Sequence, residues 1–286
     1  PIPSSSPPSP ALTPSGVTPS SPTPDPVPAL ELTVMTYNIM GINPPRRWFP
    51  FSSPKKLKAA ARVEPALALI GQADADILGL QEFRPGTAAG RRLAAGLDGY
   101  GWAAEGAPSA TSPREQVAIP VLYRSSRFTL LDSGSRRLSQ RGHDGAYMDR
   151  YVAWARLRER TTDRELLVFN YHAHPRQGKR YARVRSDAVR QLLEVIAEVD
   201  PDRTTPIVVL GDFNARSNET RTLYRDHIDR FALNGIVDAA AIAQADTSDI
   251  PGADSHNRLS APVAGRDVAN VVRRNGRHID YVWVPI

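Results

Sequence analysis

The chain has 286 residues, 41% of them apolar and 23% charged, which suits one large folded domain or two small ones. It contains no Cys, and this excludes disulfides and thiolate metal sites. The net charge of +6 favours polyanionic partners such as nucleic acid or an anionic membrane surface, although a generally Arg-rich protein would carry the same charge. No apolar run approaches the roughly 18 residues of a membrane span.

The first 28 residues differ in composition from the rest of the chain. They are dominated by Pro, Ser and Thr and carry one charge, at Asp25. Such a segment has no apolar face to bury, so residues 1–28 are predicted to form a disordered, extended spacer. Because the chain begins with Pro rather than Met, the spacer suits a secreted or cell-surface protein whose signal peptide or anchor has been removed; a cloning artefact is the alternative.

From Ala29 onward, strand and helix patterns follow one another without a repeat or a further linker, which predicts one α/β domain over residues 29–286. Strands are expected at 32–38, 77–83, 117–123, 127–133, 151–159, 165–174, 206–214 and 278–284. The strands at 117–123 and 127–133 are expected to be neighbours. Helices are expected at 56–73, 91–97, 183–199 and 219–235, and Pro65 would open a second part of the first helix.

Polar residues stand in or at the ends of several predicted strands. They are Asn38, Glu82, His172, Asp212, Asn214 and Asp280. The stretch VVLGDFNAR (208–216) is the sharpest case, because a buried apolar run ends in a carboxylate and an amide two residues apart. Side chains at i and i+2 of an extended chain share a face, so Asp212 and Asn214 are expected to point to one place. Strand ends are a common location for the residues of a site.

This set of oxygen donors, without Cys, suits Mg²⁺, Mn²⁺ or Ca²⁺ rather than zinc. Glu82 is the best single metal ligand, because it is the carboxylate at the end of the buried run LGLQE; a strand-end Glu in solvent is the alternative. Asp212 would orient or deprotonate a water. His172 would stabilise a phosphoryl oxygen, or would form a metal pair with His174 on the same strand face. Turn chemistry is the alternative for Asn38 and Asn214.

In chain order, the segments MTYNIMG, ILGLQEF, VLYRSSRF, FNYHAH, VVLGDFNAR and HIDYVWV resemble the endonuclease/exonuclease/phosphatase superfamily, which has the deoxyribonuclease I-like fold. The resemblance covers roughly residues 31 to 286. It implies a four-layer α-β-β-α sandwich, in which two packed, mostly antiparallel β-sheets carry helices on their outer faces. It also implies Mg²⁺-dependent hydrolysis of a phosphoester at one edge of the sandwich.

The resemblance also implies roles for four of these residues. Glu82 would be the Mg²⁺ ligand, and Asn38 would be the neighbour that helps to place metal and phosphate. Asp212 would orient or activate the attacking water, and Asn214 would stabilise the pentacovalent transition state. Fixed donors and a divalent cation at such a site would neutralise the charge of an in-line phosphoryl transition state.

Three further assignments follow from the same resemblance. His172 would be either an acid to the leaving group or a phosphate ligand, Arg150 would contact a phosphate, and Asp280 would hold the second histidine of the family. The sequence stops shortly after Asp280, without the Ser-Asp-His segment that carries that histidine. The explanations are a missing C-terminal segment, which would leave the last strand as an unpaired edge, substitution by His278 or His256, and a non-catalytic relative.

A nuclease is the first hypothesis for the substrate, with DNA favoured, because backbone phosphates attract the cations that the chain carries in excess. RQGKRYARVRSD (176–187) is a basic run with one aromatic residue, for which a solvated helix face is the alternative. RRWFPFSSPKK (46–56) would overhang the site, where its aromatic residues would stack on bases or enter a membrane interface. The membrane alternative predicts a secreted sphingomyelinase or another phospholipid phosphodiesterase. A monomer is expected.

Overall fold

Two β-sheets and four helices make up the described part of the chain, which is a computed structural model covering residues 30–39, 59–104, 118–143, 145–146, 148–215, 222–239 and 279–285. One compact unit begins at Leu32. No helix in these ranges is long and apolar enough to cross a membrane. The predicted spacer at 1–28, the loop at 46–56 and the histidines at 256 and 278 lie outside the described residues.

The smaller sheet has four strands in the order β1-β2-β4-β3. Its strands are β1 (Val34–Asn38), β2 (Ile77–Gln81), β3 (Tyr100–Ala103) and β4 (Val121–Arg124). β1 and β2 are parallel, and the other pairs are antiparallel.

The larger sheet has six strands in the order β5-β6-β7-β8-β10-β9. Its strands are β5 (Phe128–Ser139), β6 (Arg150–Glu159), β7 (Glu165–His172), β8 (Ile207–Asp212), β9 (Ile236–Asp238) and β10 (Asp280–Pro285). β7 and β8 are parallel, whereas their other neighbours pair in antiparallel fashion. The predicted α/β fold with two mixed, mostly antiparallel sheets is confirmed.

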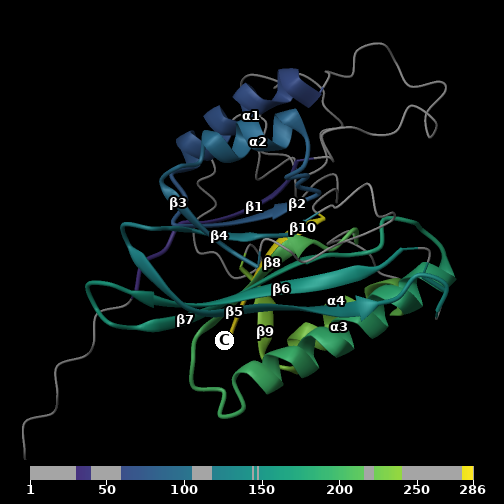
Figure 1. Cartoon of the computed structure of the whole chain (residues 1–286). Helices are drawn as coiled ribbons and strands as arrows, with labels where there is room; N and C mark the ends of the chain where they lie inside the picture. Colours follow the sequence, from purple (N-terminus) through teal and green to yellow (C-terminus); the bar gives the residue numbers. More distant parts are fainter. Residues whose placement is uncertain are drawn as a thin grey trace, which may run out of the picture. The chain divides into compact units, whose positions relative to one another are not determined.

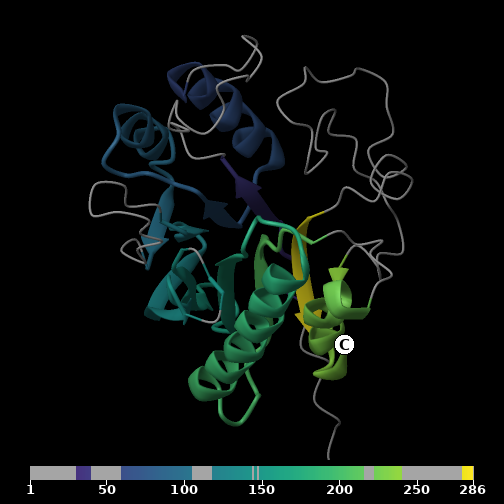
Figure 2. The same cartoon turned by 90° about the vertical axis from the view of Figure 1, so that its right-hand side faces the viewer.

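Helices cover the outer face of each sheet (Figure 1). The helices are α1 (Ala59–Ala73), α2 (Ala88–Ala95), α3 (Lys179–Val199) and α4 (Thr222–Leu233). Strand alternation explains the layers: Leu78 and Leu80 of β2 pack in the cluster with α1 and α2, whereas Ile77 joins the cluster between the sheets. On the other side, Phe169 of β7 packs against α3, which lies beside α4 (Figure 2).

Three expectations differ from the structure. β4 and β5 belong to different sheets, because the chain crosses from one sheet to the other through residues 125–127. Pro65 lies inside one continuous helix, α1, and does not begin a second part. β10 is not an unpaired edge, because β9 hydrogen-bonds along its other side. β9 has only three residues, too few to show a strand pattern in the sequence.

The contact between α3 and α4 contains a buried histidine, His227. It is 0% exposed, and neither ring nitrogen has a hydrogen-bond partner among the described residues. Burial and the positive charge of Arg185 lower the pKa of His227 to about 3, although Asp226 opposes this shift. The ring is therefore neutral in the folded chain near pH 7.

We expect this histidine to make the fold sensitive to acid. Its pKa is lower in the folded state, about 3, than the ordinary value of 6.5, so protons bind preferentially to the unfolded chain. The stabilisation is complete above pH 6.5 and is lost as the pH falls from 6.5 toward 3. In urea unfolding at several pH values, His227→Leu should show a shallower loss of stability than the wild-type chain. Equal slopes for the two proteins would contradict this assignment.

Candidate active site

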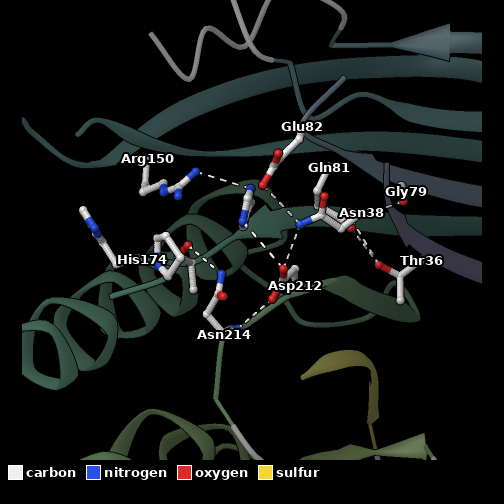
Figure 3. Close-up of polar contacts among 12 residues, drawn as sticks. Thr36, Asn38, Gly79, Gln81, Glu82, Arg150, His174, Asp212 and Asn214 are labelled. Carbon is white, nitrogen blue, oxygen red and sulfur yellow. Dashed lines mark hydrogen bonds and ion pairs between the residues drawn. The ribbon is translucent and has the colours of Figure 1, made fainter. Parts of the chain in front are cut away.

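Polar residues from both sheets meet where their strands end (Figure 3). In the larger sheet, His172 of β7, Asp212 of β8 and Asp280 of β10 are register partners across three neighbouring strands. In the smaller sheet, Asn38 of β1 is the register partner of Gln81, which precedes Glu82. Asn38 Nδ2 donates to Asp212 Oδ2 at 2.9 Å and therefore links the two sheets at this point.

A buried amide pair joins the sheets beside this link. Gln81 Nε2 donates to Asn170 Oδ1 at 2.7 Å and to Thr36 Oγ1 at 3.1 Å. Asn170 Nδ2 donates to the carbonyl oxygens of Leu80, at 2.9 Å, and Pro120, at 2.8 Å. Gln81 and Asn170 are both 0% exposed, so each hydrogen bond replaces one that water would otherwise make. The pair fixes how the smaller sheet sits on β7.

Close approach of the sheets requires a glycine at position 79. A Cβ atom there would lie 1.9 Å from Leu210 Cδ1 and 3.0 Å from Asn170 Oδ1. Gly211 is required for a different reason: its φ is 148°, and a Cβ atom would lie 1.9 Å from the backbone oxygen of Tyr171. These two glycines explain why LGLQE and LGDFN carry Gly close to the polar residues of the site.

Glu82 is held in an unusual backbone conformation directly after β2. Its φ is +58°, a region that costs a non-glycine residue free energy. The residues on both sides are fixed, because Gln81 belongs to β2 and Phe83 exchanges two backbone hydrogen bonds with Ala118, at 3.1 and 2.6 Å. The carboxylate is half-buried, and its Oε1 lies 3.5 Å from Asn38 Nδ2. Figure 3 shows it facing Asn38 and Asp212.

Asp212 lies at the centre of the contacts and is 4% exposed. Its Oδ2 accepts the hydrogen bond from Asn38, and its Oδ1 accepts one from the backbone N–H of Asn214 at 2.8 Å. Burial raises the pKa of Asp212 to about 6, although these two hydrogen bonds and Arg150 lower it. A carboxylate with a pKa close to neutral is suited to accept a proton from water.

Asn214 lies beside Asp212, but not through the extended geometry expected from its i+2 position. β8 ends at Asp212, and Asn214 has a φ of +50° in the turn that follows. Its Nδ2 donates to the backbone oxygen of Ala173 at 3.1 Å. The prediction of a shared location is therefore right in outcome and wrong in mechanism, because a turn and not a strand places this amide.

His172 is 3% exposed and lies between Arg150 and Asp212. Its Nδ1 is 3.3 Å from Arg150 Nη1, and its Nε2 is 3.7 Å from Asp212 Oδ2. Arginine can only donate, so Nδ1 is the acceptor and the ring proton resides on Nε2. Burial, with the positive charges of Arg150 and His174, holds the pKa of His172 well below its usual range. The contact with Asp212 is therefore made by a neutral ring that presents an N–H.

A neutral His172 ring can donate a hydrogen bond to a phosphate oxygen. The two roles considered for His172, an acid to the leaving group and a phosphate ligand, stay predictions. Arg150, at 4% exposed, contacts His172 directly, so its first effect in the structure is to fix the tautomer of that ring. Asp280 is half-buried beside Asp212 on the neighbouring strand. The sequence did not indicate that Arg150 contacts His172 or that Asp280 lies beside Asp212.

The donor set fits a divalent cation of the magnesium type. Glu82 would supply a carboxylate and Asn38 would supply its amide oxygen, since the Nδ2 of Asn38 is directed to Asp212 and Glu82. Mg²⁺ is commonly held by one or two such oxygen ligands, with waters and substrate phosphate completing the octahedron. Within the described ranges, no group of three or more His, Cys, Asp or Glu is arranged to hold a metal. The alternative of a His172–His174 metal pair stays a prediction.

Comparison with known proteins assigns the chain to a family. The profile of the Endonuclease/Exonuclease/phosphatase family matches residues 35–285. The chain belongs to this family. It is therefore a phosphoester hydrolase by family, and members of the family generally use divalent metal ions. A search of curated proteins gives no match.

Solved structures with the same fold include enzymes with different substrates. Bt3783, a mannosyl-6-phosphatase of Bacteroides thetaiotaomicron VPI-5482, is 19% identical with a TM-score of 0.62, over 89% of this chain and 85% of that one. The human Nocturnin catalytic domain is 21% identical with a TM-score of 0.61, over 88% and 80%. ANGEL2, a 2′,3′-cyclic phosphatase, is 21% identical with a TM-score of 0.54, over 72% and 58%. At these identities the likeness shows the fold.

We expect the amide pair to be essential for stability. Asn170→Ala would remove three buried hydrogen bonds, one from Gln81 Nε2 and two to the carbonyl oxygens of Leu80 and Pro120, at a cost of about 2–4 kcal/mol in the free energy of unfolding. Asn234→Ala is the matched control, because that amide hydrogen-bonds a carbonyl at the surface and its loss should cost less than about 1 kcal/mol. Equal losses for the two variants in urea unfolding would contradict the role of the pair.

Proposed function

We propose that the chain is a metal-dependent phosphodiesterase acting on nucleic acid. The observation that carries the proposal is the meeting of Glu82 and Asn38 from one sheet with Asp212 and His172 from the other, joined by the 2.9 Å hydrogen bond between Asn38 and Asp212. Each of these residues supplies a group that in-line phosphoryl transfer needs: oxygen ligands, a base and a hydrogen-bond donor.

Each residue of the site has its own role in the proposed reaction. Glu82 and the amide oxygen of Asn38 would hold the divalent cation, which supplies positive charge against the phosphate when it is bound. Asp212 accepts a proton from the attacking water and orients that water. Neutral His172 donates from Nε2 to a phosphate oxygen, and Arg150 keeps the ring in this tautomer. Asn214 holds the carboxylate of Asp212 through its backbone N–H.

The substrate class rests on charge. The net charge of +6 suits a polyanionic substrate, because cations that neutralise backbone phosphates contribute much of nucleic-acid affinity. The sphingomyelinase alternative depended on the aromatic loop at 46–56, which lies outside the described residues, so no structural observation favours it. Export of the protein stays a prediction from the composition of residues 1–28.

The proposal predicts metal-dependent nicking of supercoiled plasmid. The wild-type chain should nick DNA with Mg²⁺ and not with EDTA, and Glu82→Gln and Asp212→Asn should each lose at least about 100-fold in rate, the scale expected for a general base or a metal ligand. The surface acids Glu64 and Asp163 offer matched controls, and Glu64→Gln and Asp163→Asn should retain the wild-type rate.

Small substrates separate a diesterase from a monoesterase. The chain should hydrolyse bis(p-nitrophenyl) phosphate faster than p-nitrophenyl phosphate under the same metal conditions. A preference for the monoester, or a rate insensitive to both Glu82→Gln and Asp212→Asn, would contradict the proposed function.

A further inference from the structure

A cluster of cations surrounds one tyrosine at the beginning of α3. Arg176, Lys179 and Arg180 are exposed, and Tyr181 is half-buried. Arg176 Nη1 donates to Tyr181 Oη at 3.1 Å, and the guanidinium carbons of Arg176 and Arg180 each lie 5.9 Å from the tyrosine ring centroid. Arg180 Nε also donates to the backbone oxygen of Gly145 at 2.9 Å. These four residues, 176 and 179–181, are called the α3 platform below.

The α3 platform borders the candidate active site through Tyr181, and the neighbouring Gln177 makes a second contact with the site. The ring of Tyr181 stacks against buried His174, with centroids 6.1 Å apart and an interplanar angle of 28°. His174 follows His172 by two residues and lies on the same flank of the site as Arg150 (Figure 3). In addition, Gln177 Nε2 donates to the backbone oxygen of Asn214 at 3.4 Å. A substrate that extends beyond the site on this side would reach the platform.

Two cations of the platform, Lys179 and Arg180, lie where positive charge is electrostatically unfavourable for α3. Lys179 and Arg180 lie in its first turn, where the helix dipole disfavours positive charge, and that turn contains no acidic residue. Neither side chain makes a salt bridge among the described residues. Farther along the same helix, Arg190 is paired with Asp187 at 2.7 Å and with Glu194 at 2.5 Å. Lys179 and Arg180 therefore add positive charge to a first turn that has no acidic residue of its own.

We propose that the α3 platform binds phosphates of a nucleic-acid strand next to the one that is hydrolysed. This inference rests on the proposed function and extends it to the substrate outside the site. A nucleic-acid strand presents several phosphates in series, which matches cations at three nearby positions. A phospholipid headgroup, in contrast, carries a single phosphate. Guanidinium planes held around a tyrosine also provide faces on which bases can stack.

Binding without catalysis tests the inference most cleanly. The probe is a fluorescein-labelled, single-stranded 12-nucleotide DNA, measured by anisotropy in EDTA with the full chain carrying Asp212→Asn. Adding Arg176→Gln and Arg180→Gln should weaken binding at least fivefold and should lower the slope of log K against log salt concentration by about 1.4, which corresponds to two phosphate contacts of a single strand. Arg190→Gln in the same background is the matched control and should bind like its parent.

Two results would overturn the inference. One is a double variant that binds the DNA as tightly as the Arg190→Gln control. The other is a loss of binding to vesicles of sphingomyelin and phosphatidylserine that exceeds the loss of DNA binding, which would assign the platform to lipid. Thermal unfolding of the double variant should match that of the control, since the substituted side chains are exposed.

Hydrolysis of bis(p-nitrophenyl) phosphate, which lacks neighbouring phosphates, separates the inference from the function on which it rests. If the chain hydrolyses this diester and the double variant still binds DNA normally, the platform inference fails and the proposed function stands. If the double variant loses DNA binding while no diester is hydrolysed, the platform stands and the proposed function fails.

Discussion

The buried hydrogen bonds between Gln81 and Asn170 fix the two sheets against each other, and the candidate site depends on that registration. Gln81 directly precedes Glu82, and Asn170 lies two residues before His172. The 2.7 Å bond between the two amides therefore sets the position of Glu82 relative to His172. Two amides can do this in the buried interior, where the dielectric constant is low, because their N–H donors have hydrogen-bond acceptors. A buried amide pair with unsatisfied donors or acceptors would destabilise the fold.

Charge and tautomer in the site follow from the same burial. Burial away from water raises the pKa of the Asp212 carboxyl and lowers that of the His172 imidazole. Near neutral pH, Asp212 is therefore suited to act as a base, and the neutral His172 beside it is a hydrogen-bond donor. Arg150 then selects which nitrogen carries the proton. The protonation states of Asp212 and His172 therefore depend on the elements that bury them. The two residues are buried together because β7 and β8 end side by side.

The sequence predicted the strands with long apolar runs and the polar residues at their ends, because burial on both faces leaves a simple pattern. It could not predict how the strands pair: β4 and β5 lie in different sheets, and β9 is too short to show a strand pattern. Nor did it predict that Pro65 lies inside a continuous helix. Gln81 and Asn170 were missed because a polar residue in an apolar run does not reveal its partner. The roles of the site residues, the Ser-Asp-His question, export and a monomeric state stay predictions.

The central claim is that Asn38 and Asp212, from different sheets, act as one unit. A double-mutant cycle with Asn38→Ala and Asp212→Asn tests it, with the rate of metal-dependent hydrolysis of bis(p-nitrophenyl) phosphate as the measurement. If the account is right, the double variant is no slower than the slower single variant, because either change already breaks the unit. Losses that multiply in the double variant would show that the two residues act independently and would contradict the account.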